Sequence, residues 1–337
     1  MQDIELLGAP GSPYTRKMLA LLRYRRIRYR MVWGAHSDPP AGYPTPKVKL
    51  LPTFYLPTPN GLEAMVDSTP IIQRLELAYV DRSVIPDHPV LQFINLLIED
   101  FADEWLTKAM FHYRWHYAED AAHAAPWLIY SQYPQMSETS AQKMAATFAQ
   151  RQISRLNMVG SNESTAPVIE SSFQRLISIM DGLIEHQGFV LGNRPASADF
   201  AIYGQLTQLG MFDPTPTRFL EKTSPRLRAW LDRMEDLSGH SASDWISTTS
   251  IGDPLFALLK EIGHFYAPFL LANHHAISQG LDEFETPIDG QRWRQPVFLY
   301  QAKCLEALRK FRQDMSDKDR SELDLLLKGS GCETLFA

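Results

Sequence analysis

Residues 4–33 read IELLGAPGSPYTRKMLALLRYRRIRYRMVW and predict a β-α-β unit. The first five residues favour a short strand, and the last seven, IRYRMVW, favour another because they are rich in β-branched and aromatic side chains. Between them, Met18, Leu21 and Leu22 have the spacing of one buried helix face. Because a helix connects the two strands, we expect the strands to be parallel.

The next stretch, residues 35–80, completes a recognisable order of elements. The segment AHSDPPAGYPTP (35–46) is rich in proline and is expected to be a loop. In TFYLPTPNGLEAMV (53–66), Asn60-Gly61 separates two apolar runs and suits a tight hairpin turn. A helix should then open at DSTP (67–70), because cap residues precede a proline there. The order β-α-β, loop, β-β-α is the thioredoxin-like pattern.

From about residue 90 the hydrophobic period becomes helical. Residues 89–117 predict one long amphipathic helix, and residues 171–188 predict another that ends at Gly188. The fold class is therefore an α/β thioredoxin-like domain followed by an all-α domain with additional C-terminal helices. The expected parts are the thioredoxin-like domain at 1–80, a linker at 81–89, an all-helical domain at 90–240 and a helical extension at 241–337.

The extension is expected to contain three helices and one polar connection. The helices are predicted around residues 254–272, 293–313 and 317–328. The polar stretch SQGLDEFETPIDGQ (278–291) should join the first two as a loop.

Composition indicates an ordinary globular protein of about two domains, with 45% hydrophobic and 21% charged residues in 337. No run approaches the ~18 consecutive apolar residues of a membrane span, and the first residues lack the pattern of a secretory signal. Cys304 and Cys332 cannot form a framework of several disulfides. We therefore expect a cytoplasmic protein that does not bind membranes.

Basic residues gather in one segment although the net charge is −6. Residues 16–30 contain seven Arg and Lys and no acidic residue. Such a segment binds a polyanion in some proteins, and in others it is a helix face whose charges pair with acids elsewhere. The acidic run IEDFADEW (98–105) is a candidate partner, and the acidic remainder of the chain opposes nucleic-acid binding. We expect no nucleic-acid partner.

Ser12 stands after the first predicted strand and before Pro13, which is the position of a helix N-cap. Its hydroxyl would lie at the positive end of the helix, where thiolates and other anions are stabilised. Ser12 either only caps the helix or also handles a thiol.

Two further segments have the residues of a peptide-binding site. Pro52 lies just before the third predicted strand, where a cis-proline in thioredoxin-like folds leaves the backbone of the preceding residue, here Leu51, able to pair with a peptide. A plain turn proline is the alternative. Asp67 and Ser68 precede a helix, where Asp67 would accept an ammonium group and the helix end a carboxylate. Taken singly, Asp67 and Ser68 are ordinary cap residues. Together the three segments describe a site for a thiol peptide with a free α-amino-acid end.

These motifs resemble the glutathione-binding domain of the cytosolic glutathione S-transferases, in a bacterial-like serine type. The matching segments are SPYTRK (12–17), LLPTF (50–54), NG (60–61), VDSTPIIQRLE (66–76), FVLGNRPASADFAIYGQL (189–206) and SPRLRAWLDRM (224–234). The resemblance covers about residues 3–238 and implies that fold, glutathione as co-substrate, a homodimer and a role in detoxification.

The resemblance also implies roles for individual residues. Glutathione would lie along Leu51 and Pro52 with its γ-glutamyl end at Asp67 and Ser68, and the Ser12 hydroxyl would stabilise its thiolate. Tyr14 is the alternative catalyst, because some classes of the family use a tyrosine. A hydrophobic electrophile would bind between the domains, and the candidates for that wall are Trp105, His112, Tyr113 and Trp115.

Several positions depart from the family pattern. Positions 12 and 15 are not cysteine, so the nucleophile of omega-type thioltransferase chemistry is missing here. Leu50 stands where a basic or amide residue often holds the glycine carboxylate of glutathione. Lys47 and Lys49 are the candidate substitutes, with Lys49 nearer, but neither is in register. Ala196 replaces the usual Ser or Thr three residues before Asp199, so the capping box of that helix is broken or shifted. The extension has no counterpart in the compact form of the family.

The predicted function is that of a glutathione S-transferase acting on a hydrophobic electrophile. The first alternative is a non-catalytic binding or assembly module in which the extension contacts a partner or covers the site. The second is a glutathione-dependent isomerase, lyase or dehalogenase, because one activated thiolate serves all of these. His112 and His116 have a spacing that can chelate, but no third ligand is evident, and we predict no metal.

Overall fold

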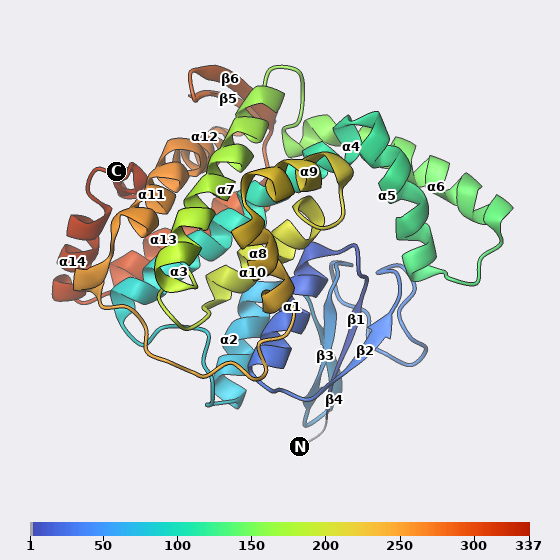
Figure 1. Cartoon of the computed structure of the whole chain (residues 1–337), viewed down its shortest axis with the longest axis horizontal. Coiled ribbons are helices and arrows are strands. Elements are labelled where there is room, and N and C mark those ends of the chain that lie inside the picture. Colours follow the sequence, from blue (N-terminus) through green and yellow to red (C-terminus); the bar gives the residue numbers. More distant parts are fainter. Residues whose placement is uncertain (1–2) are drawn as a thin grey trace.

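The computed structural model describes residues 3–337 and begins with a four-stranded sheet flanked by helices (Figure 1). Strand β1 pairs in parallel with β2 and antiparallel with β3, and β3 pairs antiparallel with β4, giving the order β2-β1-β3-β4. This is the thioredoxin-like arrangement that the sequence predicts. The elements are β1 (Ile4–Gly8), α1 (Pro13–Tyr24), β2 (Tyr29–Trp33), β3 (Thr53–Thr58), β4 (Gly61–Met65) and α2 (Ser68–Ala78).

Local sequence explains this domain. Helix α1 begins at Pro13 with Ser12 as its N-cap and buries Met18, Leu21 and Leu22, as expected from their spacing. The turn between β3 and β4 contains Asn60 and a glycine at position 61 with φ of 117°, a conformation that other residues rarely adopt. The proline-rich segment between β2 and β3 contains no helix or strand, as predicted.

Helices make up most of the chain after residue 88. The first group is α3 (Pro89–Phe101), a π-helical turn (Ala102–Leu106), α4 (Thr107–His116), α5 (Ala118–Gln132), α6 (Glu138–Ile153), a 3₁₀ turn (Leu156–Val159), α7 (Ala166–Gln187), α8 (Ser197–Leu209), α9 (Pro214–Thr223) and α10 (Pro225–Met234). The predicted long helix at 89–117 is thus continuous but contains a π-helical turn, a feature that is frequent at functional sites.

The extension has three helical regions and one hairpin. Its elements are a 3₁₀ turn (Thr248–Ser250), α11 (Asp253–Glu261), a π-helical turn (Ile262–Tyr266), α12 (Ala267–Ser278), β5 (Glu283–Ile288), β6 (Gln291–Pro296), α13 (Leu299–Asp314), α14 (Asp317–Leu327) and a 3₁₀ turn (Cys332–Phe336). The prediction of a polar loop at 278–291 was wrong, and so was the predicted helix start at residue 293, since strands β5 and β6 form here.

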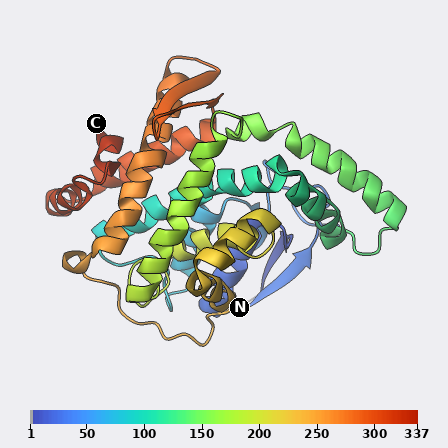
Figure 2. The same ribbon diagram turned by 45° about the horizontal axis from the view of Figure 1, so that its top comes forward.

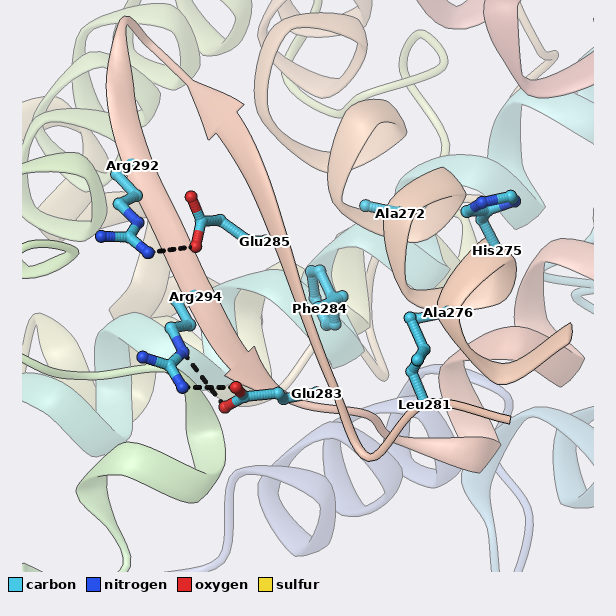
Figure 3. A pocket seen from close by; sticks show the side chains of 9 residues that line it. All are labelled: Ala272, His275, Ala276, Leu281, Glu283, Phe284, Glu285, Arg292 and Arg294. Carbon is cyan, nitrogen blue, oxygen red and sulfur yellow. Dashed lines mark hydrogen bonds and ion pairs between the residues drawn. The ribbon is translucent and has the colours of Figure 1, made fainter. Parts of the chain in front are cut away.

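Alternating exposed and buried side chains explain why residues 283–296 form the β5–β6 hairpin. Its turn is Asp289-Gly290, and both residues have positive φ, as tight hairpin turns require. Glu285 pairs with Arg292 and Glu283 pairs with Arg294 on the face toward solvent. Figure 3 shows these pairs on one side of the hairpin and Phe284 on the other, toward helix α12. Figures 1 and 2 place the hairpin beside the N-terminal end of α7, where the Asn162 amide donates to the Arg294 carbonyl.

The extension shares its core with the rest of the protein. One hydrophobic cluster contains side chains from the sheet, the middle helices and the extension, including Leu6, Phe93, Phe265 and Leu335. Helix α11 packs on α7, and α13 packs on α3. Packing of this kind fixes the extension against the helices that face the sheet domain.

One segment within residues 3–337, Asp253–Ser278, is long and apolar enough to span a membrane. Its most apolar window is 56% buried inside the protein. Core helices of globular proteins pass the same test, so this segment is weak evidence for a membrane span.

The contact between α1 and α8 depends on Gly204 and gives a stability prediction. A Cβ at this position would lie 2.5 Å from the Pro13 carbonyl oxygen and 3.0 Å from the Lys17 Cβ, so the helix backbones would have to separate. We expect Gly204→Ala to lower the free energy of unfolding by about 1–3 kcal/mol in urea denaturation. Gly182→Ala on α7 is the matched control, because no atom lies within 4 Å of its Cβ and it should be neutral or stabilising. Equal effects of the two substitutions would contradict the close approach.

Candidate functional site

A cavity of about 500 Å³ lies between the sheet domain and the helices and contains several of the predicted site residues. Leu51, Pro52, Asp67 and Ser68 all line it. The Leu51–Pro52 peptide bond is cis, as predicted. The starts of β3 and α2 therefore meet at one end of the cavity.

Ser12 lies beside this end of the cavity but does not line it. Its Oγ accepts a hydrogen bond from the Thr15 amide at 3.2 Å and donates to the Leu51 carbonyl oxygen at 3.4 Å. The first contact is that of an N-cap, and the second joins α1 to the cis-proline segment. Ser12 thus has a structural role in this conformation, and its role toward a thiol stays a prediction.

Tyr14 lines the cavity, but its phenol is already engaged. The hydroxyl donates to the Asp103 carbonyl oxygen at 2.7 Å. Burial, with the nearby Glu104 and Asp103, raises the pKa of Tyr14 well above its usual value. The phenol therefore stays protonated at neutral pH, and its proton is already donated in the hydrogen bond to Asp103.

Asp67 and Ser68 are held by residues of their own domain, by the extension and by the π-helical turn after α3. The Asp67 carboxylate accepts from the Thr69 amide at 3.3 Å and from the Tyr300 hydroxyl at 2.6 Å. The Ser68 Oγ accepts from Lys17 Nζ at 2.9 Å and is 3.5 Å from an Asp103 oxygen. The groups expected to hold the γ-glutamyl end thus have partners within the chain.

Lys17 is the centre of a buried network that the sequence did not single out. It is 1% exposed, and its ammonium group donates to Ser68, to Glu99 at 2.9 Å and to Asp103 at 2.6 Å. Burial alone lowers the pKa of Lys17, but the two carboxylates outweigh burial and hold the pKa above its usual value. Lys17 stays charged, and all three of its donors are used.

The other basic residues of segment 16–30 are mostly paired as well. Six of its seven Arg and Lys side chains form ion pairs, and their partners are Glu235, Glu99, Asp103, Glu76, Asp3 and Glu5. The acidic run at 98–105 supplies Glu99 and Asp103, as the sequence suggested. The expected pairing with acids is confirmed, but the segment is not one helix face, because α1 ends at Tyr24 and four of the seven basic residues follow it.

Three carboxyl groups on α3 and its π-helical turn line the cavity, and all have raised pKa values. Burial raises the pKa of Asp100 to about 6. Burial, together with Glu99 and Asp100, raises that of Asp103 to about 7 despite Lys17, and burial with Asp100 raises that of Glu104 to about 8. The cavity is acidic, and part of this acid is protonated at neutral pH.

Lys108 lies at the other end of the cavity. Its ammonium group donates to the Val159 carbonyl and to Gln295 Oε1, each at 3.0 Å, and lies 4.4 Å from the centre of the Phe269 ring. Burial lowers the pKa of Lys108 to about 7. Lys108 joins the loop before α7 to the hairpin of the extension.

The residues predicted for the acceptor wall lie elsewhere. Trp105, His112, Tyr113 and Trp115 are all buried, and none lines the cavity. Trp105 donates to the Ser172 hydroxyl and packs against Trp293, while both ring nitrogens of His112 are engaged by Ser161 and Glu170. These four side chains belong to the core because the helix that carries them is covered on several sides.

Lys49 is exposed and does not line the cavity, and its role toward the glycine carboxylate of glutathione stays a prediction. Its neighbours Val48 and Leu50 line the cavity instead.

The extension contributes four residues that the sequence did not indicate. Gln295, Phe298, Tyr300 and Gln301 line the cavity, and Gln301 donates to Glu104 at 3.0 Å. No local pattern marks them, because only long-range packing brings this segment to the sheet domain.

One group within residues 3–337 has the geometry for a metal ion, formed by His88, Asp319 and Glu322. None of the three lines the cavity, and His88 caps helix α3 through its ring nitrogen. His112 and His116 stack with ring centres 4.6 Å apart and have no third ligand among the described residues.

Comparison with family models decides the family. Residues 6–83 match the glutathione S-transferase N-terminal domain, and residues 145–233 match the glutathione S-transferase C-terminal domain.

The chain is a member of the glutathione S-transferase family.

Solved structures of the family are similar at low identity. One is a glutathione S-transferase from Methylobacterium radiotolerans in complex with glutathione sulfonate, with 19% identity, 75% of this chain and 99% of that chain covered, and a TM-score of 0.44. A Tau class enzyme from mango, Mangifera indica, has 18% identity, coverage of 69% and 88%, and a TM-score of 0.42. A beta-etherase from a Sphingobium strain has 16% identity, coverage of 69% and 95%, and a TM-score of 0.48. Comparison with curated proteins gives no match.

The glutathione S-transferase segments supply part of the cavity lining, including Met158 and Val159 from the C-terminal match. Leu51, Pro52, Asp67 and Ser68 fall within the N-terminal match. The acidic side chains of α3, together with Lys108 and the residues from the extension, lie between or beyond the two matched segments. The acidic end of the cavity, formed by Asp100, Asp103 and Glu104, therefore lies outside the two matched segments.

The helix-capping segment of the family survives in part. The Asp199 carboxylate accepts hydrogen bonds from the Ala196 and Val190 amides, each at 2.8 Å. The methyl side chain of Ala196 cannot accept the reciprocal hydrogen bond from the Asp199 amide. Ser197 instead accepts from Asn95 at 2.7 Å and donates to Glu99. One half of the capping box is lost, as the sequence indicated, and Asp199 still bonds to the backbone.

Lys17 gives the second stability prediction. Replacing it with Met leaves Glu99 and Asp103 buried without their cation, so we expect Lys17→Met to lower the free energy of unfolding by about 3–5 kcal/mol in urea denaturation. The exposed Lys143→Met on α6 should change it by less than about 0.5 kcal/mol. A loss below about 1 kcal/mol for Lys17→Met would show that the network does not hold the domains together.

Proposed function

We propose that the protein binds glutathione at the Leu51–Pro52 end of the cavity and uses its thiolate to attack an electrophile. The observation that carries the proposal is the meeting of the α1 N-terminus, the cis-proline segment and the α2 N-terminus at this end. A peptide backbone can pair with Leu51, an ammonium group with Asp67, and an anionic sulfur with the end of α1. We also propose a cytoplasmic homodimer, as the family resemblance implies.

In the proposed reaction Ser12 stabilises the sulfur. The thiol of glutathione loses its proton to solvent, and the sulfur electron pair forms a new bond to the electrophilic carbon of the acceptor. The leaving group departs to solvent with the electron pair of its bond to that carbon, as chloride does from 1-chloro-2,4-dinitrobenzene. The Ser12 hydroxyl turns from the Leu51 carbonyl oxygen, 3.4 Å away, and donates to the thiolate. The positive end of α1 adds to this stabilisation.

Substitution of Ser12 tests this role. We expect Ser12→Ala to keep glutathione binding within about threefold and to lower kcat for conjugation by about 10- to 100-fold, since one hydrogen bond to the thiolate is lost. Calorimetry with glutathione and S-hexylglutathione measures binding, and 1-chloro-2,4-dinitrobenzene measures conjugation. Tyr14→Phe is the matched control and should retain most activity, because its hydroxyl donates to Asp103. Unchanged conjugation by Ser12→Ala would remove the Ser12 assignment.

A second candidate function is a non-catalytic binding module. The contact that favours it is the hydrogen bond from Tyr300 of the extension to Asp67, because the ammonium group of glutathione needs the same carboxylate. Burial of Ser68 beneath Lys17 also favours it. In this case the extension closes the glutathione site permanently.

Removal of the Tyr300 hydroxyl separates the two candidates. If glutathione binds at Asp67, it competes with Tyr300, and we expect Tyr300→Phe to bind glutathione about 2- to 10-fold more tightly in calorimetry. Tyr130→Phe, on helix α5 and outside the cavity, should leave the affinity unchanged. Absence of glutathione binding in both the wild type and Tyr300→Phe would support the non-catalytic module and overturn the first proposal.

A further inference from the structure

The acidic end of the cavity has more carboxyl groups than the single ammonium group of glutathione needs. Glutathione offers a single ammonium group, which Asp67 would accept, while Asp100, Asp103 and Glu104 line the same cavity. These three carboxyls lie on a helix outside the segments that match the family. They call for a ligand other than the common co-substrate.

Hydrogen-bond donors around the cavity are already used within the chain. The Lys17 ammonium donates to Ser68, Glu99 and Asp103, and Lys108 donates to Val159 and Gln295. The two lining phenols, which belong to Tyr14 and Tyr300, donate to Asp103 and Asp67. A ligand that needs many donors, such as a second carboxylate, finds few here.

Two hydrogen-bond acceptor atoms at the cavity, in contrast, have no partner among the described residues. Gln301 is 4% exposed, and its Oε1 accepts no hydrogen bond from the described residues, while its Nε2 donates to Glu104. Asp103 is 8% exposed, and its Oδ1 is likewise without a partner among residues 3–337. Buried polar atoms normally have partners, so these two acceptors point to a ligand that donates hydrogen bonds.

The remaining wall of the cavity is apolar. Leu50, Met158 and Phe298 are exposed hydrophobic side chains from three different segments, and all three line the cavity. They would cover the body of a small molecule whose charged end lies among the carboxyls.

We propose that the acidic end of this cavity binds a small organic cation, an ammonium group on an apolar body, as the acceptor side of the site. Its N–H groups donate to Gln301 Oε1, Asp103 Oδ1 and Glu104, and its apolar part lies against Leu50, Met158 and Phe298. The role of this cation as acceptor substrate rests on the proposed function, whereas its binding is a property of the cavity alone.

Proton release on binding is a second, independent test of the cation site. The groups that face Glu104 are Asp100 and Asp103 on its own helix, Lys108 one turn later, Gln301, Tyr300 and Cys304 on α13, Tyr266 on the second π-helical turn, and Tyr14 on α1. Burial raises the pKa of Glu104 to about 8, and a bound cation favours its ionised form. Cation binding at pH 7.5 therefore releases protons.

Three probes of similar shape test the proposal on the full chain without glutathione. Calorimetry at pH 7.5, in phosphate and in Tris, compares phenethylammonium, neutral 2-phenylethanol and anionic phenylacetate. We expect phenethylammonium to bind at least about tenfold more tightly than 2-phenylethanol, with proton release shown by the difference in heat between the buffers, and phenylacetate not to bind. Equal affinity for the amine and the alcohol, or no binding of the amine, would overturn the proposal.

Variants locate the binding. Glu104→Gln keeps the shape of the protonated carboxyl. It should lower the affinity for phenethylammonium by about tenfold and reduce the proton release on binding. Gln301→Met removes the unpartnered Oε1 acceptor and should lower the affinity for phenethylammonium by about threefold or more. Glu306→Gln, also on α13 but exposed and outside the cavity, is the control and should bind as the wild type does. Thermal melts confirm that each variant folds, and a Glu104→Gln protein that folds and binds with wild-type affinity would overturn the assignment.

A separate glutathione titration keeps the two proposals distinct. Binding of phenethylammonium without binding of glutathione supports the cation site and overturns the proposed function. Binding of glutathione without binding of phenethylammonium supports the proposed function and overturns the cation site.

Discussion

The buried ammonium group of Lys17 is the interaction on which the rest of the site depends. A buried lysine keeps its full charge at neutral pH when carboxylates surround it, because an unpaired charge loses its hydration without compensation. Lys17 on α1 has two such carboxylates, Glu99 and Asp103 on the long helix, and it also holds Ser68 at the start of α2. One side chain thus fixes the sheet domain against the helical domain, and the cavity lies along this junction.

The same constraint makes the cavity asymmetric. Lys17 uses Asp103 and Glu99, so Asp100 and Glu104 have no comparable cation of their own. The π-helical turn places Asp103 and Glu104 at the cavity, and the extension adds Gln301 against Glu104. One part of the cavity is built from segments that match the family, and the acidic part lies outside the two matched segments.

Much of the fold could be predicted from sequence, because many of its signals are local. The β-α-β unit, the Asn60-Gly61 turn and the helix at Asp67 each depend on residues that are neighbours in the chain. The β5–β6 hairpin carried a similar signal in Asp289-Gly290, but its charged outer face resembled a polar loop. The π-helical turn could not be predicted, because one extra residue in a helix changes neither composition nor period enough to be seen.

The candidate site also has some features that local sequence predicts and others that only tertiary packing positions. The sequence by itself determined the caps at Ser12 and Asp67 and the position of Pro52, since a cap or a turn bonds to backbone only a few residues away. Tertiary structure alone decided that Lys17 reaches Glu99, that Tyr300 reaches Asp67, and that Trp105 and His112 belong to the core. Those contacts join residues far apart in the chain, and only the packing of whole elements against one another brings these residues together.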